Sequence, residues 1–279
     1  MRAEKNKKLS MLRAASTAAA FGLAALAVPG CFLATDVDRF RETPPNTSKF
    51  FDLSFTITGA DSHVDETFEL RVVDRQKNII AMLRASPLGG RDATFNLPSS
   101  LPKTGGLRLV FWADHNNSGA FDQAPLPFDH SWFVDVDPFV PKDPASNLVK
   151  IEFEHNTAFV PVEGKEIGGP AEVSFSGMRG QLGRRAQVSI SDANSKQLVG
   201  VLRATKITQD AFTLRLPGIV DPGAGTRYSV LVTLDDGTPA AGGLEGYRFE
   251  RASELAGLKL TFDPTKDQAT KTTEALPRP

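Results

Sequence analysis

The sequence predicts an all-β protein made of two tandem antiparallel β-sandwich domains that follow a signal peptide and a short linker. Three observations support this prediction. Short segments with alternating apolar and polar residues recur from residue 50 onward, turns rich in Gly, Pro and Asp separate them, and the second half of the chain repeats features of the first in the same order. Beyond the N-terminal region, no window of ten or more residues shows a sustained helical period.

Residues 1–30 are predicted to be a signal peptide. A head with five Lys/Arg residues and one acid precedes the run from Ala14 to Val28, which is small and apolar but too short and too weakly apolar for a comfortable membrane-spanning helix. The rest of the chain carries 27 basic and 32 acidic residues, a net charge of −5. This acidic balance gives no electrostatic footprint for nucleic acid.

The signal run ends in Val28-Pro29-Gly30-Cys31, which contains the only cysteine of the chain. This tetrapeptide resembles the lipobox of bacterial lipoproteins, in which an aliphatic residue, a small residue and Gly or Ala precede the lipidated cysteine. Pro29 departs from the Ala, Ser or Thr that is commoner at its position. The resemblance implies cleavage before Cys31, acylation of Cys31, and an exported protein anchored to the bacterial membrane, with the outer membrane or cell surface favoured. The alternative is an incidental free thiol.

Residues 31–49 are polar and contain adjacent prolines, so we expect an extended linker that tethers the folded body to the membrane. The first sandwich is predicted over residues 50–160 and begins with the alternating segment Phe51–Thr58. Further strands are predicted at Thr67–Val73, Ile79–Arg84, Ala93–Leu97, Leu107–Trp112, Ser131–Val136 and Leu148–Glu154. Seven short strands at this spacing are typical of an immunoglobulin-like sandwich; without a Cys pair of the antibody kind, the likeness is architectural only.

A second sandwich of the same plan is predicted over residues 171–264. The triplet Leu83-Arg84-Ala85 recurs as Leu202-Arg203-Ala204, and Leu107–Asp114 corresponds to Tyr228–Asp235. The order of these features is preserved, which favours a duplicated domain.

Two further boundaries follow from composition. The Gly- and Pro-rich residues 161–170 are predicted to link the two sandwiches, and residues 265–279 contain so few apolar side chains that we expect a flexible tail.

The turn after Leu107–Trp112 reads Asp-x-Asn-x-Ser-Gly-x-x-Asp and resembles the calcium loops of EF-hand and dockerin type. Alternate oxygen-bearing residues of a tight loop converge on one point, where a hard cation wants six to eight oxygens. The predicted ligands are Asp114, Asn116, Ser118, Ala120 through its carbonyl, and Asp122.

The loop departs from its relatives at position twelve, which is Pro125 where they have a bidentate Glu. Asp129 is a weaker candidate that would supply the missing carboxylate by folding back. The resemblance thus implies a structural calcium ion of low affinity. The alternative is an ordinary turn in which Asp and Asn side chains bond to their own backbone.

His115 and His130 raise a different possibility, a transition-metal site that includes Asp114 or Asp129, because imidazole suits Zn, Cu and Ni. Against it, His115 occupies a loop position whose side chain normally points away from the ion, and the two histidines lack a short fixed spacing. Surface or hydrogen-bonded histidines are the alternative. The other two histidines of the chain show no ligand spacing.

Trp112 and Trp132 flank the loop on strands that we expect to be neighbours. If exposed together with His115 and His130, they would form a platform that stacks on a sugar or binds a protein. The alternative is that the two indoles pack in the core and anchor the loop.

The sequence contains no Gly-x-Ser-x-Gly elbow, no His-Glu-x-x-His motif and no phosphate-binding loop, so an enzyme is not expected. We expect a lipid-anchored cell-envelope protein that binds a protein or glycan ligand, or acts as a scaffold, without catalysis. The alternative is a metal-dependent or carbohydrate-active envelope enzyme, or a transition-metal carrier, that uses Asp114, His115, Asp129 and His130.

Overall fold

The computed structural model describes residues 48–123, 128–221, 225–238 and 243–272. The predictions for the signal peptide, the lipobox with Cys31, most of the linker, Pro125 and the end of the tail fall outside the described residues. Within the described part of the chain, no helix has the length and apolar character needed to cross a membrane.

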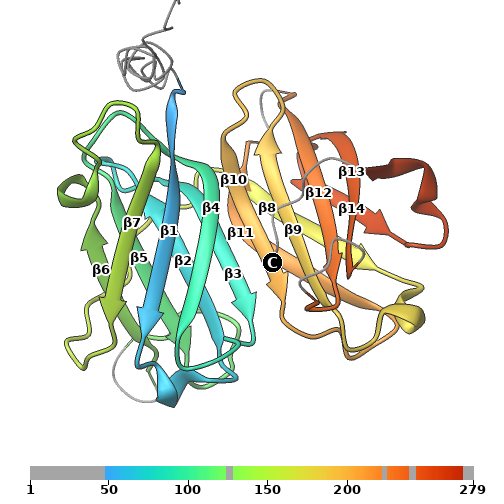
Figure 1. Cartoon of the computed structure of the whole chain (residues 1–279), viewed down its shortest axis with the longest axis horizontal. Helices are drawn as coiled ribbons and strands as arrows, with labels where there is room; N and C mark the ends of the chain where they lie inside the picture. Colours follow the sequence, from blue (N-terminus) through green and yellow to red (C-terminus); the bar gives the residue numbers. More distant parts are fainter. Residues whose placement is uncertain (1–47, 124–127, 222–224, 239–242, 273–279) are drawn as a thin grey trace, which may run out of the picture. The chain divides into compact units, whose positions relative to one another are not determined.

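The all-β prediction is confirmed, since the described residues form strands joined by turns and short 3-10 helices (Figure 1). The strands of the first half are β1 (Phe50–Thr58), β2 (Thr67–Val73), β3 (Ile79–Ser86), β4 (Ala93–Pro102), β5 (Arg108–Asp114), β6 (His130–Asp135) and β7 (Leu148–Glu154). Strands β4-β1-β7 form one sheet, and strands β3-β2-β5-β6 follow one another in a second sheet. Their apolar side chains share one core, as expected of a sandwich.

The second half repeats this topology strand for strand. Its strands are β8 (Gly169–Phe175), β9 (Arg185–Asp192), β10 (Leu198–Ala204), β11 (Phe212–Val220), β12 (Arg227–Asp235), β13 (Leu244–Ala252) and β14 (Leu258–Phe262). The orders β11-β8-β14 and β10-β9-β12-β13 match β4-β1-β7 and β3-β2-β5-β6. Most neighbouring strands are antiparallel, but the first and last strands of each half, β1–β7 and β8–β14, pair in parallel. No hairpin connects these pairs, so their direction is not forced to be antiparallel.

A parallel pairing of β3 with β10 joins the two halves through one continuous nine-stranded sheet. The register runs from Gly200 opposite Met82 to Ala204 opposite Ser86. The repeated Leu-Arg-Ala triplets therefore lie on adjacent strands. The sequence does not predict this pairing, because a match between two segments shows that they are equivalent but not that they touch.

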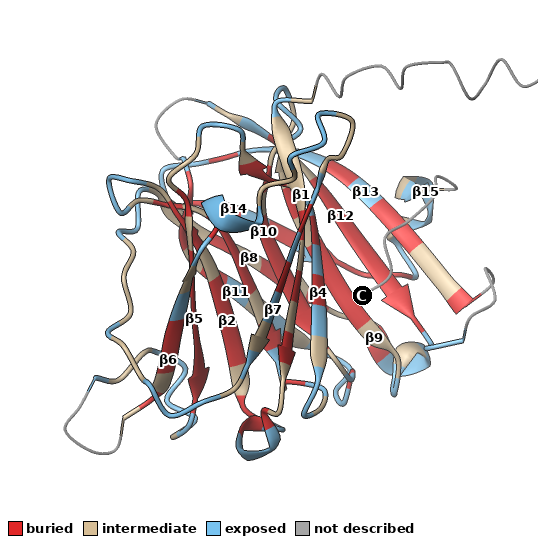
Figure 2. Cartoon of the chain, turned by 60° about the vertical axis from the view of Figure 1, so that its left-hand side comes forward, coloured by how far each residue is buried: buried red, intermediate tan, exposed pale blue. Residues whose placement is uncertain are grey.

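Alternation along the strands explains which side chains fill the cores (Figure 2). In β1, Leu53, Phe55 and Ile57 are buried, whereas the residues between them are only partly covered. In β7, Val149 and Ile151 are buried in the same way. Successive side chains of a strand point to opposite faces, so this pattern turns one face of each sheet inward.

The joining strands couple the two cores. Ile79 and Met82 of β3 belong to the core of the second half, and Leu198 and Val201 of β10 belong to the core of the first. A cavity made in either strand would therefore be felt in both halves.

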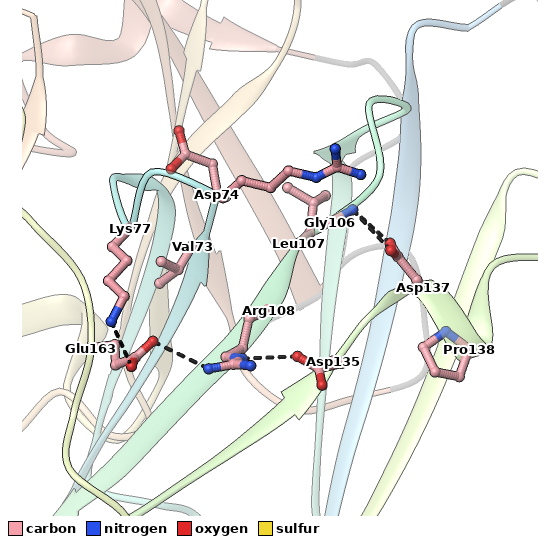
Figure 3. Close-up of a pocket in the computed structure, with 11 residues that line it drawn as sticks. Val73, Asp74, Lys77, Gly106, Leu107, Arg108, Asp135, Asp137, Pro138 and Glu163 are labelled. Atoms are coloured by element: carbon pink, nitrogen blue, oxygen red, sulfur yellow. Dashed lines mark hydrogen bonds and ion pairs between the residues drawn. The ribbon is translucent and has the colours of Figure 1, made fainter.

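The segment between the halves is held by ion pairs beside a cavity of about 520 Å³ (Figure 3). Glu163 accepts hydrogen bonds from Lys77 Nζ at 3.0 Å and from Arg108 Nη1 at 3.2 Å. Arg108 Nε also donates to Asp135 at 2.8 Å. Each ion pair at a solvent-exposed surface stabilises the fold by less than about 1 kcal/mol. We therefore interpret these ion pairs as weak contacts that hold the segment in place, and we assign no ligand to the cavity.

Residues 265–272, which we expected to belong to a flexible tail, form the 3-10 helix η6 (Asp267–Thr270) and the short strand β15 (Lys271–Thr272). Strand β15 pairs with β13. Hydrogen bonds, and not buried apolar side chains, hold residues 265–272 in this conformation. Thr265 donates to Asp263 and Asp267 accepts from the Asp263 backbone N–H. The hydrogen bonds from Thr265, followed by the nearby Lys266, lower the pKa of Asp263 to about 2.

A buried ion pair in β2 gives a test of the fold. Glu69 is fully buried and accepts from Arg71 Nε at 2.6 Å, from Arg84 Nη2 at 2.5 Å and from Trp112 Nε1 at 3.0 Å. Burial raises the pKa of Glu69, but the two guanidinium groups and the indole outweigh this effect and lower it. We predict that Glu69→Ala lowers the free energy of unfolding by about 3–5 kcal/mol, because it leaves two partly buried guanidinium groups and the buried indole N–H of Trp112 without their acceptor. Glu163→Ala, at the surface, should cost less than about 1 kcal/mol.

The same carboxyl predicts a pH dependence. The folded-state pKa of Glu69 is below its ordinary value of 4.5. The ionised carboxylate therefore contributes its full share to the free energy of unfolding above pH 4.5, and this contribution is lost as the pH falls through the lower, folded-state pKa. Urea unfolding between pH 7 and pH 3 measures both effects. An acid profile that is the same in native protein and in Glu69→Ala would contradict this prediction.

Candidate functional site

The predicted calcium loop follows β5 and is organised around the side chain of Asp114. Asp114 is only 1% exposed. One of its oxygens accepts from the Ser118 backbone N–H at 2.9 Å and the other from the Gly119 N–H at 2.8 Å. Gly119 has φ of 81°, which favours glycine. The chain therefore wraps around Asp114 at the positions that the calcium-loop pattern specifies.

The remaining predicted ligands bond to one another within the loop. Asn116 Nδ2 donates to Asp122 Oδ2 at 2.8 Å, and the Ser118 hydroxyl donates to the Ala120 carbonyl at 2.8 Å. These contacts place the side-chain and carbonyl oxygens on one small loop. They also provide the internal hydrogen bonds expected of an ordinary Asx turn.

Asp129, the weaker candidate, does fold back onto the loop. Its oxygens accept from the backbone N–H groups of His115 at 2.9 Å and Asp122 at 2.7 Å. Burial raises the pKa of Asp129. The two backbone hydrogen bonds lower this pKa, but the nearby carboxylates of Asp114 and Asp122 raise it, and the net shift is upward. Asp129, which directly precedes β6, thus binds both ends of the loop through these two hydrogen bonds and acts as a latch.

Asp114 has a counterpart in the second half, Asp235, whose strand neighbour is positively charged. The strand registers place Thr67 opposite Asp114 in the first half and Arg185 opposite Asp235 in the second. Asp235 is buried like Asp114, and Arg185 Nη2 donates to it at 2.7 Å. Thr67 offers no charge, and no Lys or Arg of the described residues forms an ion pair with Asp114. Among the described residues, the hydrogen bonds to the Asp114 carboxylate come from backbone N–H groups.

The two tryptophans pack inside the protein rather than forming an exposed platform. Trp112 is 0% and Trp132 is 2% exposed. The Trp112 indole N–H donates to Glu69, and the Trp132 indole N–H donates to the Asn156 carbonyl at 2.9 Å. Each ring thus has an apolar body in the core and a satisfied polar edge.

All four histidines of the chain lie in the first half, and the structure brings them together at one end of it. They come from four segments: His63 from the 3-10 helix η2 (Asp61–His63), His115 from the loop, His130 from the start of β6 and His155 from just beyond β7. We call these residues together with Glu66 the histidine cluster.

Glu66 links two of the rings. His63 Nδ1 lies 2.6 Å from one Glu66 oxygen, and His115 Nδ1 lies 2.8 Å from the other. Ligand-type atoms of these three residues all lie within 4.8 Å of one another. Glu66 and His63 are buried, whereas the His115 side chain is half exposed.

The other nitrogen of His63 faces two more rings. His63 Nε2 lies 3.2 Å from His155 Nε2 and 3.3 Å from His130 Nδ1. Burial lowers the pKa of His130 and of His155, and the proximity of His63 lowers both further. Trp132 lies against His63 and His155, with ring centroids 5.6 Å and 5.3 Å away.

The structure gives His115 and His130 different neighbours from those predicted. Asp114 and Asp129 accept backbone N–H groups, while the imidazole of His115 meets Glu66 and stacks on the ring of His130 at 5.1 Å. Sequence reasoning missed His63, Glu66 and His155. His63 and Glu66 are three residues apart, but the contacts of His63 with the other rings span 67 and 92 residues. One signal was available: all four histidines fall in one copy of the duplicated sandwich and none in the other.

No protein-family model and no curated protein matches the chain. Among the solved structures that are similar to it, three illustrate the low identity. The TIE protein of Bacillus anthracis is 14% identical over 76% of this chain, with a TM-score of 0.20. The tip fimbrial protein Mfa3 of Porphyromonas gingivalis is 11% identical over 72%, with a TM-score of 0.26, and the shaft pilin SpaA of Lactobacillus rhamnosus GG is 11% identical over 76%, with a TM-score of 0.20.

The coverage of those proteins differs. The matched region spans 34% of the TIE protein, 81% of Mfa3 and 96% of SpaA. TM-scores of this size do not establish a shared fold, so the fold assignment rests on the strand pairing described above.

The latch formed by Asp129 predicts a stability effect that does not depend on a bound ion. With a chelator present, Asp129→Ala should lower the free energy of unfolding by about 1–3 kcal/mol, because two partly buried backbone N–H groups lose a charged acceptor. Asp122→Ala is the matched control, since it keeps the backbone N–H that Asp129 binds and should cost less. Urea unfolding measures both variants; equal losses would show that Asp129 is not the latch.

Proposed function

We propose that this chain is a lipid-anchored protein of the bacterial cell envelope with a non-catalytic binding or scaffolding role, and that its first sandwich holds a structural calcium ion in the loop from Asp114 to Asp122. The lipobox-like sequence ending at Cys31 supports the anchor. Several acyl chains, each contributing about 0.8 kcal/mol per buried CH₂, would hold the protein on a membrane without a spanning helix.

The observation that carries the calcium proposal is the difference between the two buried aspartates. Asp235 has the guanidinium of Arg185 at 2.7 Å, whereas Asp114 has Thr67 at the equivalent position. A buried carboxylate is stabilised by a nearby positive charge. A calcium ion would supply to Asp114 the charge that Arg185 supplies to Asp235.

Further oxygen-bearing groups for such an ion lie on the same loop. Carboxylates have about four lone-pair sites, so Asp114 and Asp129 can hold the backbone N–H groups that they accept and still bind a cation. Asn116, Ser118 and the Ala120 carbonyl add neutral oxygens, and Asp122 adds a third carboxylate. With no bidentate Glu at position twelve, the dissociation constant would be ~10⁻⁴–10⁻³ M, the range of extracellular calcium modules.

This arrangement favours a stabilising role over a catalytic one. An ion enclosed by loop oxygens shapes the end of the sandwich and has no need of an open coordination position for a substrate. The binding partner of the protein would then be a protein or glycan of the envelope. The lipid anchor would keep the two sandwiches at the membrane surface.

Calcium should raise the thermal stability of the protein. At 10 mM calcium, a dissociation constant of ~10⁻⁴–10⁻³ M gives about 1.4–2.7 kcal/mol of added stability, and hence a higher Tm. Asp114→Asn should abolish the increase. Asp235→Asn is the matched control in the second half and should keep it. Differential scanning calorimetry with calcium or a chelator measures the shift; an unchanged Tm in native protein at 10 mM calcium would contradict the proposal.

The anchor is tested separately by membrane fractionation of cells that express the full chain. Cys31→Ser should move the protein from the membrane fraction to the soluble fraction, because it removes the acylated residue. A high-salt wash of the native sample controls for electrostatic attachment. Retention of Cys31→Ser in washed membranes would show that another feature holds the protein there.

A further inference from the structure

The histidine cluster brings together three groups of the kind that bind a transition metal, using side chains that the proposed calcium ion does not use. We propose that His63, Glu66 and His115 bind one divalent transition-metal ion, Zn²⁺ or an ion of similar ligand preference, through one ring nitrogen of each histidine and the carboxylate. Two imidazoles and one carboxylate are a ligand set that zinc takes in proteins.

The carboxylate of Glu66 lies between the two rings. Its Oε2 is 2.6 Å from His63 Nδ1, and its Oε1 is 2.8 Å from His115 Nδ1. One ligand-type atom of each residue lies within 4.8 Å of those of the other two, and among the described His, Cys, Asp and Glu side chains this is the group of three that meets this condition. The three residues come from η2, from the position before β2 and from the position after β5, so folding assembles the set.

Small movements fit these atoms around an ion. Zinc binds imidazole nitrogen at about 2.0–2.1 Å and carboxylate oxygen at about 2.0–2.2 Å, so adjacent ligand atoms of a tetrahedral site lie about 3.3–3.5 Å apart. The contacts of Glu66 with His63 and His115, at 2.6 Å and 2.8 Å, would open by about 0.5–0.9 Å. The half-exposed side chain of His115 has room to make this adjustment.

Neighbouring rings hold the two histidines in orientation. His63 Nε2, the ring nitrogen that does not contact Glu66, lies 3.2 Å from His155 Nε2 and 3.3 Å from His130 Nδ1. The ring of His115 stacks on the ring of His130, with centroids 5.1 Å apart. Contacts of this kind orient metal-binding imidazoles. His130 and His155 are therefore positioning residues in this assignment, and not ligands.

The duplicated fold shows what stands at these positions in the second half. Strand β2 faces β5 in the first half as β9 faces β12 in the second, with Thr67 opposite Asp114 and Arg185 opposite Asp235. Counting along the chain from these paired positions gives each proposed ligand a counterpart. The counterparts are Gln181 for His63, Arg184 for Glu66 and Asp236 for His115.

A positive group occupies the central position in the second half. Arg184 Nη1 donates to Gln181 at 2.5 Å, and Arg184 Nη2 donates to the carbonyl oxygens of Leu234 and Gly243, each at 2.9 Å. The first half has the carboxyl group of Glu66 at that position, with an imidazole on each of its oxygens. One copy thus contains a cation surrounded by acceptors, and the other contains groups that can ligate a cation.

Solvent reaches one side of the proposed site. The side chain of His115 is 50% exposed, whereas those of His63 and Glu66 are 1% and 11% exposed. An ion can enter past His115, and water can take the coordination position that three protein ligands leave open. The buried ring of Trp132 lies 5.6 Å from the ring of His63, so an ion bound here is close to an indole.

The test is metal binding by the purified full chain. Calorimetric titration with Zn²⁺, in chelator-free buffer at pH 7.5 with calcium present to fill the loop, should give one strong site per chain. Titration with Cu²⁺ should quench tryptophan fluorescence with the same stoichiometry, because Trp132 lies against His63. Electron paramagnetic resonance of the one-to-one Cu²⁺ complex should show two nitrogen ligands. Absence of a strong Zn²⁺ site in the native protein would overturn the proposal.

Variants distinguish ligands from positioning residues. His115→Ala, at a half-exposed position, should lower the Zn²⁺ affinity by more than the roughly 10- to 100-fold that loss of a supporting partner costs, and should leave one nitrogen ligand in any Cu²⁺ complex. His155→Ala is the matched control and should keep one ion per chain with two nitrogen ligands. Unchanged binding in His115→Ala, or loss of the site in His155→Ala alone, would overturn the assigned ligands. Circular dichroism confirms that each variant is folded.

Calcium separates this site from the loop that begins at Asp114. The Zn²⁺ affinity and stoichiometry should be the same with and without 10 mM calcium, because calcium prefers oxygen ligands and this site offers two nitrogens. Displacement of Zn²⁺ by calcium would place the zinc in the loop and overturn the assignment. A Tm that does not respond to calcium, in a protein that still binds Zn²⁺, would contradict the calcium proposal and leave this site standing.

Discussion

Burying a carboxylate inside a β-sandwich costs free energy unless hydrogen-bond donors or a positive charge come with it, and the two halves of this protein meet that constraint differently. At the end of β12 in the second half, the protein supplies its own cation, because Arg185 pairs with the buried Asp235. In the first half the equivalent end contains Asp114, which is held by backbone N–H groups, and Glu66, which is held by imidazoles. The proposed calcium loop follows from this difference.

The scaffold explains how such a difference persists in a duplicated fold. The two sandwiches have the same strand order, so each position at the end of one sheet has a counterpart in the other. The parallel pairing of β3 with β10 joins the sheets, and each of these two strands places side chains in the core of the other half. The loop from Asp114 to Asp122 connects β5 to β6 and takes no part in the β3–β10 pairing, so its residues can vary without disturbing that pairing.

The sequence predicted much of the fold and little of the histidine site, for physical reasons. Period-two alternation is a local signal, and it located Thr67–Val73 and Leu148–Glu154 with the bounds that the structure gives them. It could not predict the β3–β10 pairing, because register between distant strands depends on the whole topology. The loop around Asp114 was recognisable because its oxygen spacing is local. The contacts of His63 with residues 67 and 92 positions away arise only when sheets and turns are assembled.

The most direct measurement is a crystal structure of the protein grown with Ca²⁺, with anomalous diffraction recorded at a long X-ray wavelength, where calcium scatters anomalously. The account predicts an anomalous peak beside the carboxylate of Asp114, with none beside Asp235, which Arg185 already pairs. Clear density for the loop from Asp114 to Asp122 with no anomalous peak beside Asp114 would contradict it.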